Sequence, residues 1–300
     1  MAVISYEINE KNYYPESAEG MHVLYADRTD SYRATIREIE YIQRHRPLHL
    51  YLMSLISVEP GKKYPLIMYC QGSGYRKQDV LRPLPQLAEL VHKGYFVASV
   101  EYRYTDEGGL FPAQVQDFRA AVRYLRLHAD ELNIDPDRIA FWGDSSGGHT
   151  IALAALGNDP SFDADDFNEV SAAAKCCVDF YGVSEMEGMK ETLTPELIKY
   201  FDGDPMQKLF GGPLNEHMDA VEKANVMHYI RPGKKTPPFL LIHGDEDEKV
   251  PFTQSLHLYQ TLRKNSCRAE LYKVRGAGHG NRVWTKDTMK IAENFLRAYL

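Results

Sequence analysis

The stretch FWGDSSGGH, residues 141–149, decides the fold of this chain. It ends an apolar run, residues 138–142, that is typical of a buried strand, and it leads into residues 147–156, whose small and apolar side chains predict a helix. Ser145 has a glycine two positions before it and another two positions after it, in the pattern G-x-S-x-G. A serine held at positive φ in so tight a turn requires neighbours without side chains. The stretch therefore predicts a nucleophilic Ser145 exposed at the N-terminus of a helix.

On both sides of this turn, short apolar strands alternate with helices. Two strands are expected within residues 33–57, before the alternation begins near residue 64. Further strands are predicted at 65–70, 96–102, 138–142, 173–180, 239–243 and 269–274, and helices at 84–93, 115–132, 147–156, 253–264 and 286–300. Such an alternation is typical of a mainly parallel sheet that helices cover on both faces. We therefore predict the α/β class with a mostly parallel central sheet.

The length of 300 residues fits a single α/β domain. Residues 183–229 depart from the alternation, since they are less regular and contain Gly203, Gly211 and Pro213. We interpret this segment as a small cap insertion over one end of the sheet. The prediction is one domain over residues 1–300 with a cap at 183–229.

The charge balance excludes several classes of partner. The chain has 35 Lys and Arg against 42 Asp and Glu, and its net charge of −7 has the wrong sign for binding nucleic acid or an anionic membrane. It contains no apolar run of the roughly 18 residues that a membrane span needs. Residues 1–20 lack the basic start and apolar stretch of a signal peptide. We expect a cytoplasmic protein with no nucleic-acid or membrane partner.

The four cysteines predict neither a disulfide framework nor a metal site. Cys70, Cys176 and Cys177 lie in apolar, strand-like runs, where a free thiol behaves as a small hydrophobic side chain. Because side chains alternate along a strand, Cys176 and Cys177 would point to opposite faces of the sheet. The sequence has no C-x-x-C pair and no Cys/His cluster with zinc-ligand spacing, so no metal is expected.

A serine hydroxyl needs a base to become a good nucleophile, and His279 is the best candidate. It lies in GAGHG, residues 276–280, a polar loop between the last predicted strand and the last helix. A histidine in this loop can reach across the carboxyl edge of the sheet. His243 closes an apolar strand and fits structural hydrogen bonding, and His149 lies inside the helix after the serine, where packing is the more common role.

The acid that orients this base is expected after the strand at 239–243. The run GDEDEKVP, residues 244–251, offers four carboxylates. The partner of the imidazole must be held by the loop rather than exposed to solvent. We favour Asp247 over Asp245, which directly follows a glycine and is expected to shape the turn, and we interpret Glu246 and Glu248 as solvated charges.

Acyl transfer also needs hydrogen-bond donors aimed at the developing oxyanion. The backbone N–H of Ser146 is one candidate, because it follows the nucleophile at the start of a helix. The loop QGSGY, residues 71–75, follows the strand at 65–70 and contains small residues that let a substrate carbonyl approach the backbone. The N–H groups of Gly72 and Ser73 are therefore the other candidates.

Several groups of residues make the chain, from about residue 50 to residue 300, resemble the α/β-hydrolase superfamily. They are EYRY at 101–104, FPAQ at 111–114 with Asp117, DPDRI at 135–139, the serine turn through His149, HG at 243–244 with Asp247 and VP at 250–251, and GH at 278–279. Within the superfamily the chain is similar to the bacterial esterase group, which includes carbohydrate acetyl esterases and feruloyl-esterase-like enzymes and is related to the hormone-sensitive-lipase family. Where these relatives usually carry HGGG, this chain has QGSG at 71–74.

The resemblance implies a triad of Ser145, Asp247 and His279 and needs no metal or organic cofactor. It also implies an oxyanion hole lined by Gly72, Ser73 and Ser146. The activity implied is that of a serine carboxylesterase, which hydrolyses short-chain or carbohydrate-linked esters of the acetyl or feruloyl type through an acyl-enzyme.

Aromatic residues near the predicted site bear on the substrate. Tyr75, Tyr104 and Tyr181 fall at strand ends or in loops, where a ring can stack on a sugar or a cinnamoyl group. The expected partner is a small-molecule ester, such as an acylated sugar. Two alternatives stay open: a serine peptidase similar to prolyl-oligopeptidases and, from a different class, a non-catalytic binding protein with the same fold.

Overall fold

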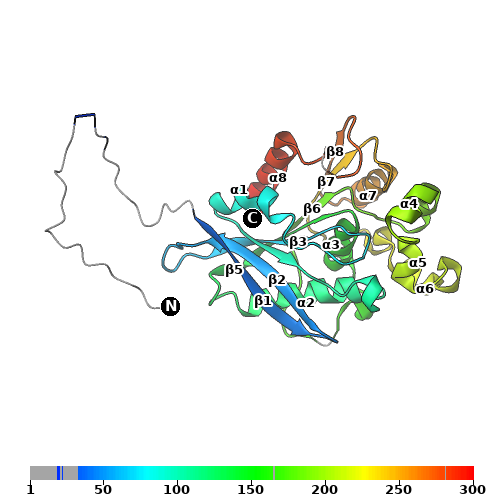
Figure 1. Ribbon diagram of the computed structural model, residues 1–300, viewed down its shortest axis with the longest axis horizontal. Coiled ribbons are helices and arrows are strands. Elements are labelled where there is room, and N and C mark those ends of the chain that lie inside the picture. Colours follow the sequence, from blue (N-terminus) through cyan, green and yellow to red (C-terminus); the bar gives the residue numbers. More distant parts are fainter. Residues whose placement is uncertain (1–18, 21, 23–32, 165, 281) are drawn as a thin grey trace.

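The computed structural model describes residues 19–20, 22, 33–164, 166–280 and 282–300, and its centre is an eight-stranded sheet (Figure 1). The strands are β1 (Ala34–Gln43), β2 (Pro47–Leu55), β3 (Tyr64–Cys70), β4 (Phe96–Val100), β5 (Ile134–Asp144), β6 (Cys176–Phe180), β7 (Phe239–Gly244) and β8 (Ala269–Val274). Their order across the sheet is β1-β2-β4-β3-β5-β6-β7-β8. The pairs β1–β2 and β2–β4 are antiparallel, and all other neighbours are parallel. The prediction of an α/β fold with a mostly parallel sheet is confirmed.

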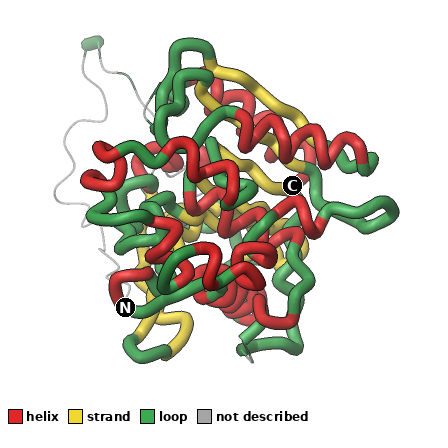
Figure 2. Tube along the Cα trace, turned by 90° about the vertical axis from the view of Figure 1, so that its right-hand side faces the viewer, coloured by secondary structure: helices red, strands yellow, loops and turns green. Residues whose placement is uncertain are grey.

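Helices cover both faces of this sheet (Figures 1 and 2). The longer ones are α1 (Leu84–His92), α2 (Ala113–Leu127), α3 (Ser146–Leu156), α7 (Thr253–Lys264) and α8 (Lys286–Tyr299). Apolar side chains of α2, α3 and α7 form one core, and those of α1 and α8 form a second core on the opposite face. None of the helices within the described ranges has the length and apolar character that crossing a bilayer requires.

The two adjacent cysteines of β6 point to the two faces of the sheet. In β6, Cys176 belongs to the core under α1 and α8, whereas Cys177 belongs to the core under α2, α3 and α7. This is the alternation that strand periodicity predicts. All four cysteines are free and buried, which the apolar surroundings of Cys70, Cys176 and Cys177 in the sequence indicated for those three.

The segment between β6 and β7 contains the residues predicted to form a cap. Its helical elements are η4 (Glu187–Thr192), α4 (Pro195–Tyr200), α5 (Pro205–Phe210), η5 (Leu214–Glu216), α6 (Met218–Lys223) and η6 (Val226–Tyr229). Asp204 caps α5 by accepting the N–H groups of Met206 and Gln207. Buried side chains of this segment form a third apolar cluster with Tyr75 and Val250, which lie in the loops after β3 and β7. The segment therefore packs against loops at the carboxyl ends of the strands.

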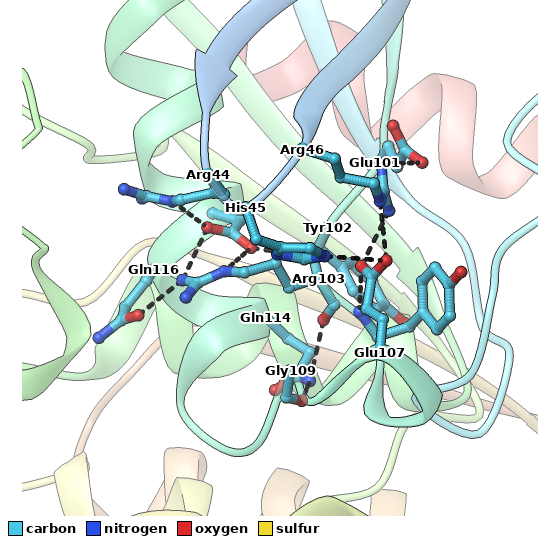
Figure 3. Close-up of polar contacts among 12 residues, drawn as sticks. Arg44, His45, Arg46, Glu101, Tyr102, Arg103, Glu107, Gly109, Gln114 and Gln116 are labelled. Atoms are coloured by element: carbon cyan, nitrogen blue, oxygen red, sulfur yellow. Dashed lines mark hydrogen bonds and ion pairs between the residues drawn. The ribbon is translucent and has the colours of Figure 1, made fainter.

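A network of ion pairs holds the β1–β2 turn against the chain that follows β4 (Figure 3). The side chain of Asp117 on α2 is fully buried and accepts the guanidinium groups of Arg44 at 3.0 Å and Arg103 at 2.8 Å. Arg46 pairs with Glu107 at 2.7 Å, in the short helix η2 (Thr105–Glu107). Because Asp117 is fully buried and paired with both arginines, removing it would take away an ion-pair partner from each of them. The network thereby fixes the path of residues 101–107 beside the site.

Candidate active site

The predicted nucleophile lies where β5 ends and α3 begins. Ser145 has φ 53° and ψ −125°, a strained conformation for a residue other than glycine. The crossing is tight, since a Cβ added to Gly143 would lie 2.5 Å from the carbonyl oxygen of Gly147. A Cβ added to Gly147 would collide with the carbonyl oxygen of Cys70 on β3. Both glycines are therefore required by the strand–turn–helix that the sequence predicted.

Ser145, His279 and Asp247 come together from three separate loops. The Oγ of Ser145 lies 3.1 Å from Nε2 of His279, within hydrogen-bonding distance. On the other side of the ring, Nδ1 of His279 lies 2.8 Å from Oδ2 and 3.0 Å from Oδ1 of Asp247. The Asp247 side chain is fully buried and that of His279 is 12% exposed, so the imidazole is open to a substrate only from the Ser145 side. Because the carboxylate accepts from Nδ1–H, Nε2 keeps a lone pair for the serine proton.

The carboxylate of Asp247 is held by its own loop. Its Oδ1 accepts the backbone N–H groups of Lys249 and Val250, both at 2.9 Å. Burial acts to raise the pKa of Asp247, but hydrogen bonds from His243 and His279 and from the backbone outweigh it and hold the pKa well below its usual range. Asp247 is therefore ionised throughout the neutral range.

His243 was predicted to make structural hydrogen bonds, and it also supports the carboxylate. Its Nδ1 lies 2.7 Å from Oγ of Ser255, and its Nε2 lies 2.9 Å from the carbonyl oxygen of Val250. Since that carbonyl can only accept, Nε2 carries the proton and Nδ1 accepts from Ser255. The same Nε2 is 3.3 Å from Oδ2 of Asp247. Sequence reasoning missed this second contact, although the spacing of four residues between the end of β7 and the loop after it is a usable signal.

Tyr181 packs against the imidazole. Its ring centroid is 4.7 Å from that of His279, in an edge-on arrangement, and its hydroxyl accepts the indole N–H of Trp284 at 2.7 Å. Trp284 in turn stacks on Trp142 of β5, with ring planes 6° apart. Tyr181 lines the pocket, as predicted, but it is almost fully buried. Its described contacts are with Trp284, through the hydroxyl, and with the ring of His279.

The three predicted oxyanion donors are placed differently from one another. The N–H of Ser146 is the first of α3, where no intrahelical acceptor is available. The N–H of Gly72 is donated to Oδ1 of Asp144 at 2.9 Å, and that of Ser73 to Oγ of Ser146 at 3.0 Å. Gly72 is nonetheless against the nucleophile, because a Cβ added to it would lie 2.6 Å from Cβ of Ser145. Both loop amides have protein acceptors, whereas no acceptor for the Ser146 N–H is found among the residues that the structure describes.

Asp144 is a further carboxyl beside the nucleophile that sequence reasoning did not single out. Its Oδ1 accepts the hydroxyl of Tyr69 at 2.6 Å in addition to the Gly72 N–H. Burial raises the pKa of Asp144 above its ordinary value, against the opposing effect of these hydrogen bonds. Its first consequence is structural, since it ties the loop after β3 to the end of β5.

Tyr75 and Tyr104, predicted to contact substrate, lie elsewhere. The Tyr75 side chain is buried in the third apolar cluster, with its hydroxyl 3.0 Å from Nδ1 of His149. The guanidinium carbon of Arg46 lies 5.5 Å from the centroid of the Tyr104 ring, so Tyr104 belongs to the ion-pair network after β4. Neither residue lines the pocket. The correction is that both rings are committed to packing, which a position near a strand end does not distinguish from substrate contact.

The pocket over Ser145 has a volume of about 1040 Å³ and an unusual lining. Its aromatic members are Tyr69, Tyr181, Tyr200, Phe201 and Trp284, and ten charged side chains surround them. No leucine, isoleucine, valine or methionine is among the described residues that line it. Tyr200, which is 63% exposed, and Phe201 come from the end of α4. Sequence reasoning missed this aromatic pair, whose signal was its place in the predicted cap.

A group of three or more His, Cys, Asp or Glu side chains that could hold a metal ion does not occur among the residues the structure describes. The arrangement around Ser145 instead combines a nucleophile, a base, an ionised acid and a helix N-terminus. These are the parts that acyl transfer through a serine requires. The chemistry that the site can perform is the attack of a hydroxyl on a carbonyl carbon.

Comparisons with known proteins agree with this reading of the fold. The BD-FAE family model matches residues 54–262. Among curated relatives from Mycobacterium tuberculosis, the probable carboxylic ester hydrolase LipM is 25% identical over 239 residues, which cover 78% of this chain and 53% of LipM. The esterase LipC is 25% identical over 263 residues, covering 85% of this chain and 64% of LipC. The chain thus spans between half and two thirds of the length of these relatives.

Solved structures are similar over more of their length. A truncated form of a carbohydrate esterase from gut microbiota superimposes with a TM-score of 0.75 at 26% identity, covering 91% of this chain and 98% of that one. An esterase from the Planctomycetes species Thermogutta terrifontis gives a TM-score of 0.72 at 23% identity, covering 88% and 94%. Together with the sheet order, these similarities establish the α/β-hydrolase fold.

Proposed function

Since the chain belongs to the BD-FAE family and has the α/β-hydrolase fold of bacterial esterases, we propose that it is a serine carboxylesterase. The observation that carries this proposal is the unbroken line of hydrogen bonds from Ser145 through His279 to Asp247, with N···O distances of 3.1 and 2.8 Å. The names of the relatives LipM and LipC, both ester hydrolases, support the same activity.

In the first step, Oγ of Ser145 bonds to the ester carbonyl carbon while its proton passes to Nε2 of His279. Asp247 stabilises the imidazolium and keeps the ring in its orientation. The tetrahedral oxyanion forms beside the N–H of Ser146, where the dipole of α3 favours negative charge. The alcohol then leaves with the proton from His279, and Ser145 carries the acyl group.

The second step restores the enzyme by the same groups. A water molecule gives its proton to His279 as its oxygen bonds to the acyl carbon. The new tetrahedral oxyanion is held at the same N–H group. Collapse returns the proton to Oγ of Ser145 and releases the carboxylic acid, so the cycle needs only the ester and water.

For the substrate, we propose a carbohydrate-linked ester of the acetyl or feruloyl type. The pocket is lined by charged, polar and aromatic side chains and lacks the aliphatic surface that a long acyl chain or a lipid would bury. Tyr200 and Phe201 line its cap side, where the exposed ring of Tyr200 can stack on a sugar face. The carbohydrate esterase among the similar structures supports this class.

The test is a substrate panel on the purified chain and its Ser145→Ala variant. We expect turnover of 4-nitrophenyl acetate and of acetylated xylo-oligosaccharides or methyl ferulate, and a fall of at least about 10³-fold in kcat for the variant. Cleavage of peptide anilides faster than esters would indicate a peptidase instead. Turnover of the Ser145→Ala variant near the wild-type rate would contradict the proposed nucleophile.

The sugar subsite has its own arm of the panel. Tyr200→Ala should raise KM for the acetylated oligosaccharide about fivefold, because one aromatic contact contributes about 1 kcal/mol, and should leave KM for 4-nitrophenyl acetate unchanged. Tyr272→Ala is the matched control, since Tyr272 is an exposed tyrosine of β8 that does not line the pocket. Equal effects of the two substitutions would contradict the subsite.

A further inference from the structure

The side chain of Ser146, next to the nucleophile, makes contacts that its backbone role does not explain. Its Oγ accepts three consecutive backbone N–H groups, those of Ser73 and Gly74 at 3.0 Å and that of Tyr75 at 3.3 Å. These N–H groups belong to residues 71–75, which we call the oxyanion loop. Convergence of successive amides on one oxygen is the geometry with which proteins bind an anion. Here the oxygen at the focus belongs to the protein.

The hydroxyl lies behind the loop and not in the pocket. Ser146 is 2% exposed and does not line the cavity, whereas Gly72, Ser73 and Gly74 do. The hydroxyl of Tyr102, which follows β4, lies 3.2 Å from Oγ of Ser73 in the same loop. The buried oxygen of Ser146 is held in place by the three N–H groups that it accepts. It therefore acts as a rigid support for the loop.

A second contact from the same helix fixes the far end of the loop. His149, three residues after Ser146 and thus on the same face of α3, lies 3.0 Å from the Tyr75 hydroxyl and 2.7 Å from the carbonyl oxygen of Ala224. Since that carbonyl only accepts, Nε2 of His149 carries the proton and Nδ1 accepts from Tyr75. Ala224 follows α6, so this contact also joins the loop to the segment between β6 and β7.

We propose that the Ser146 hydroxyl is a positioning group for the oxyanion hole, an inference that rests on the esterase function proposed above. One residue then has two tasks: its N–H faces the oxyanion, and its Oγ fixes the opposing loop. The anchoring also immobilises Ser146 itself, so that the donor N–H is set before substrate arrives. Preorganised donors of this kind are what stabilise an oxyanion.

If the Ser146 hydroxyl hindered the oxyanion hole instead of supporting it, its removal would have the opposite effect on kcat. If Oγ of Ser146 competed with the oxyanion for the loop amides, its removal would free them and speed catalysis. If it supports the loop, its removal takes the acceptor from three N–H groups, of which that of Tyr75 is buried, and the loop shifts. The two roles are separated by the sign of the change in kcat.

The experiment compares Ser146→Ala with Thr150→Val, which also removes a buried hydroxyl from α3, but one whose described hydrogen bond stays within the helix, to the carbonyl oxygen of Ser146. For 4-nitrophenyl acetate, we expect kcat of Ser146→Ala to fall at least about tenfold with KM nearly unchanged, since loss of a whole oxyanion donor costs about 10²–10³-fold. Thr150→Val should keep the wild-type kcat. Thermal unfolding of both variants reports that they fold.

A second readout isolates the oxyanion. A trifluoromethyl ketone adds to a serine as a tetrahedral oxyanion, whereas the matching methyl ketone binds mainly as the neutral carbonyl. Ser146→Ala should weaken the trifluoromethyl ketone by the factor lost in kcat and leave the methyl ketone unaffected, which a merely structural loss would not do. If Ser146→Ala is not recovered folded, Ser146→Cys tests the same point, because a thiol of similar size is a weak acceptor.

The outcomes are distinguishable from a failure of the proposed function. Wild-type turnover that Ser145→Ala abolishes establishes the esterase, whatever Ser146 does. With that in place, a Ser146→Ala variant as active as Thr150→Val, or more active than the wild type, overturns the positioning role. Loss of affinity for both ketones alike would also overturn it.

Discussion

The contacts of Asp247 allow the effect of one substitution to be worked out atom by atom. In Asp247→Asn, the side-chain oxygen keeps the N–H groups of Lys249 and Val250, which approach Oδ1 at 2.9 Å. The new NH₂ group then occupies the Oδ2 position, 2.8 Å from Nδ1 of His279. Two N–H groups cannot face each other, so the imidazole must shift its proton to Nε2. In this neutral tautomer Nε2 carries the proton of the ring and can no longer accept the proton of Ser145.

The expected loss of kcat is large because His279 stays in place but no longer acts as a base. An exchange of acid for amide at this position of a serine triad lowers kcat by about 10⁴-fold, equivalent to about 5.4 kcal/mol in the activation free energy. We expect this loss in steady-state hydrolysis of 4-nitrophenyl acetate at neutral pH, with KM little changed.

Asp245→Asn serves as the control for the Asp247 substitution. Asp245 lies in the same loop and accepts the N–H of Gly276 at 2.8 Å, which an amide oxygen can also do. This variant should retain nearly full activity, and both variants should unfold near the wild-type temperature. If Asp247→Asn kept more than about a tenth of the wild-type kcat, the orientation of His279 by Asp247 would not be essential, and the reasoning would be refuted.

Two further predictions concern buried groups whose protonation is linked to folding. Burial lowers the pKa of His149 to about 4 from 6.5, so the unfolded chain binds an extra proton between these values, and stability falls as the pH drops through this range. His149→Gln can keep both hydrogen bonds. In urea titrations between pH 4 and 6.5, it should remove about 3 kcal/mol of the change in the free energy of unfolding. A variant whose free energy of unfolding changed with pH as much as that of the wild type would contradict this prediction. Burial, with a contribution from Asp144, raises the pKa of Asp179 to about 7 from 3.8, so its contribution is present at low pH and is lost as the pH rises through this range. The free energy of unfolding of Asp179→Asn, relative to that of the wild type, should therefore rise by up to about 4 kcal/mol between pH 4 and 7. If the two proteins instead showed the same pH dependence of stability, Asp179 would be ionised in the folded protein.

Local pattern was sufficient for most of the fold. The helix at 253–264 and the strand at 269–274 have the predicted bounds, because their apolar periodicity ends where the element ends. The predicted helix at 115–132 instead covers Ala113–Leu127. Its apolar stripe continues into Ala129, which stays buried although the backbone has left the helix. Periodicity reports burial there, not helical conformation.

The start of β5 shows a second limit of pattern. The strand was predicted at 138–142, yet β5 runs from Ile134 to Asp144. Tyr64 of β3 pairs with Ile134 and Leu66 pairs with Ile139, so the register shifts between these two pairs. Such an irregularity depends on the neighbouring strand and leaves no local signature.

The site also has a part that could be predicted from the sequence and a part that could not. Ser145, His279 and Asp247 could be chosen from the sequence because each lies in a loop at the carboxyl end of a strand, and in a parallel sheet those ends share one edge. The contacts of the Ser146 hydroxyl and the burial of Tyr75 could not be foreseen. They depend on how closely α3 approaches the oxyanion loop, a distance set by the packing of β3 and β5 and by the close approaches at Gly143 and Gly147.

The most direct test of the account is covalent labelling with a 4-nitrophenyl alkylphosphonate, followed by intact-mass measurement and peptide mapping. The account predicts one phosphonyl group per chain, attached to Ser145, with release of one equivalent of 4-nitrophenol. Labelling should be absent in Ser145→Ala and much slower in His279→Ala. Attachment at another residue, or equal labelling rates in the wild type and His279→Ala, would contradict the claim that Ser145 is activated by His279.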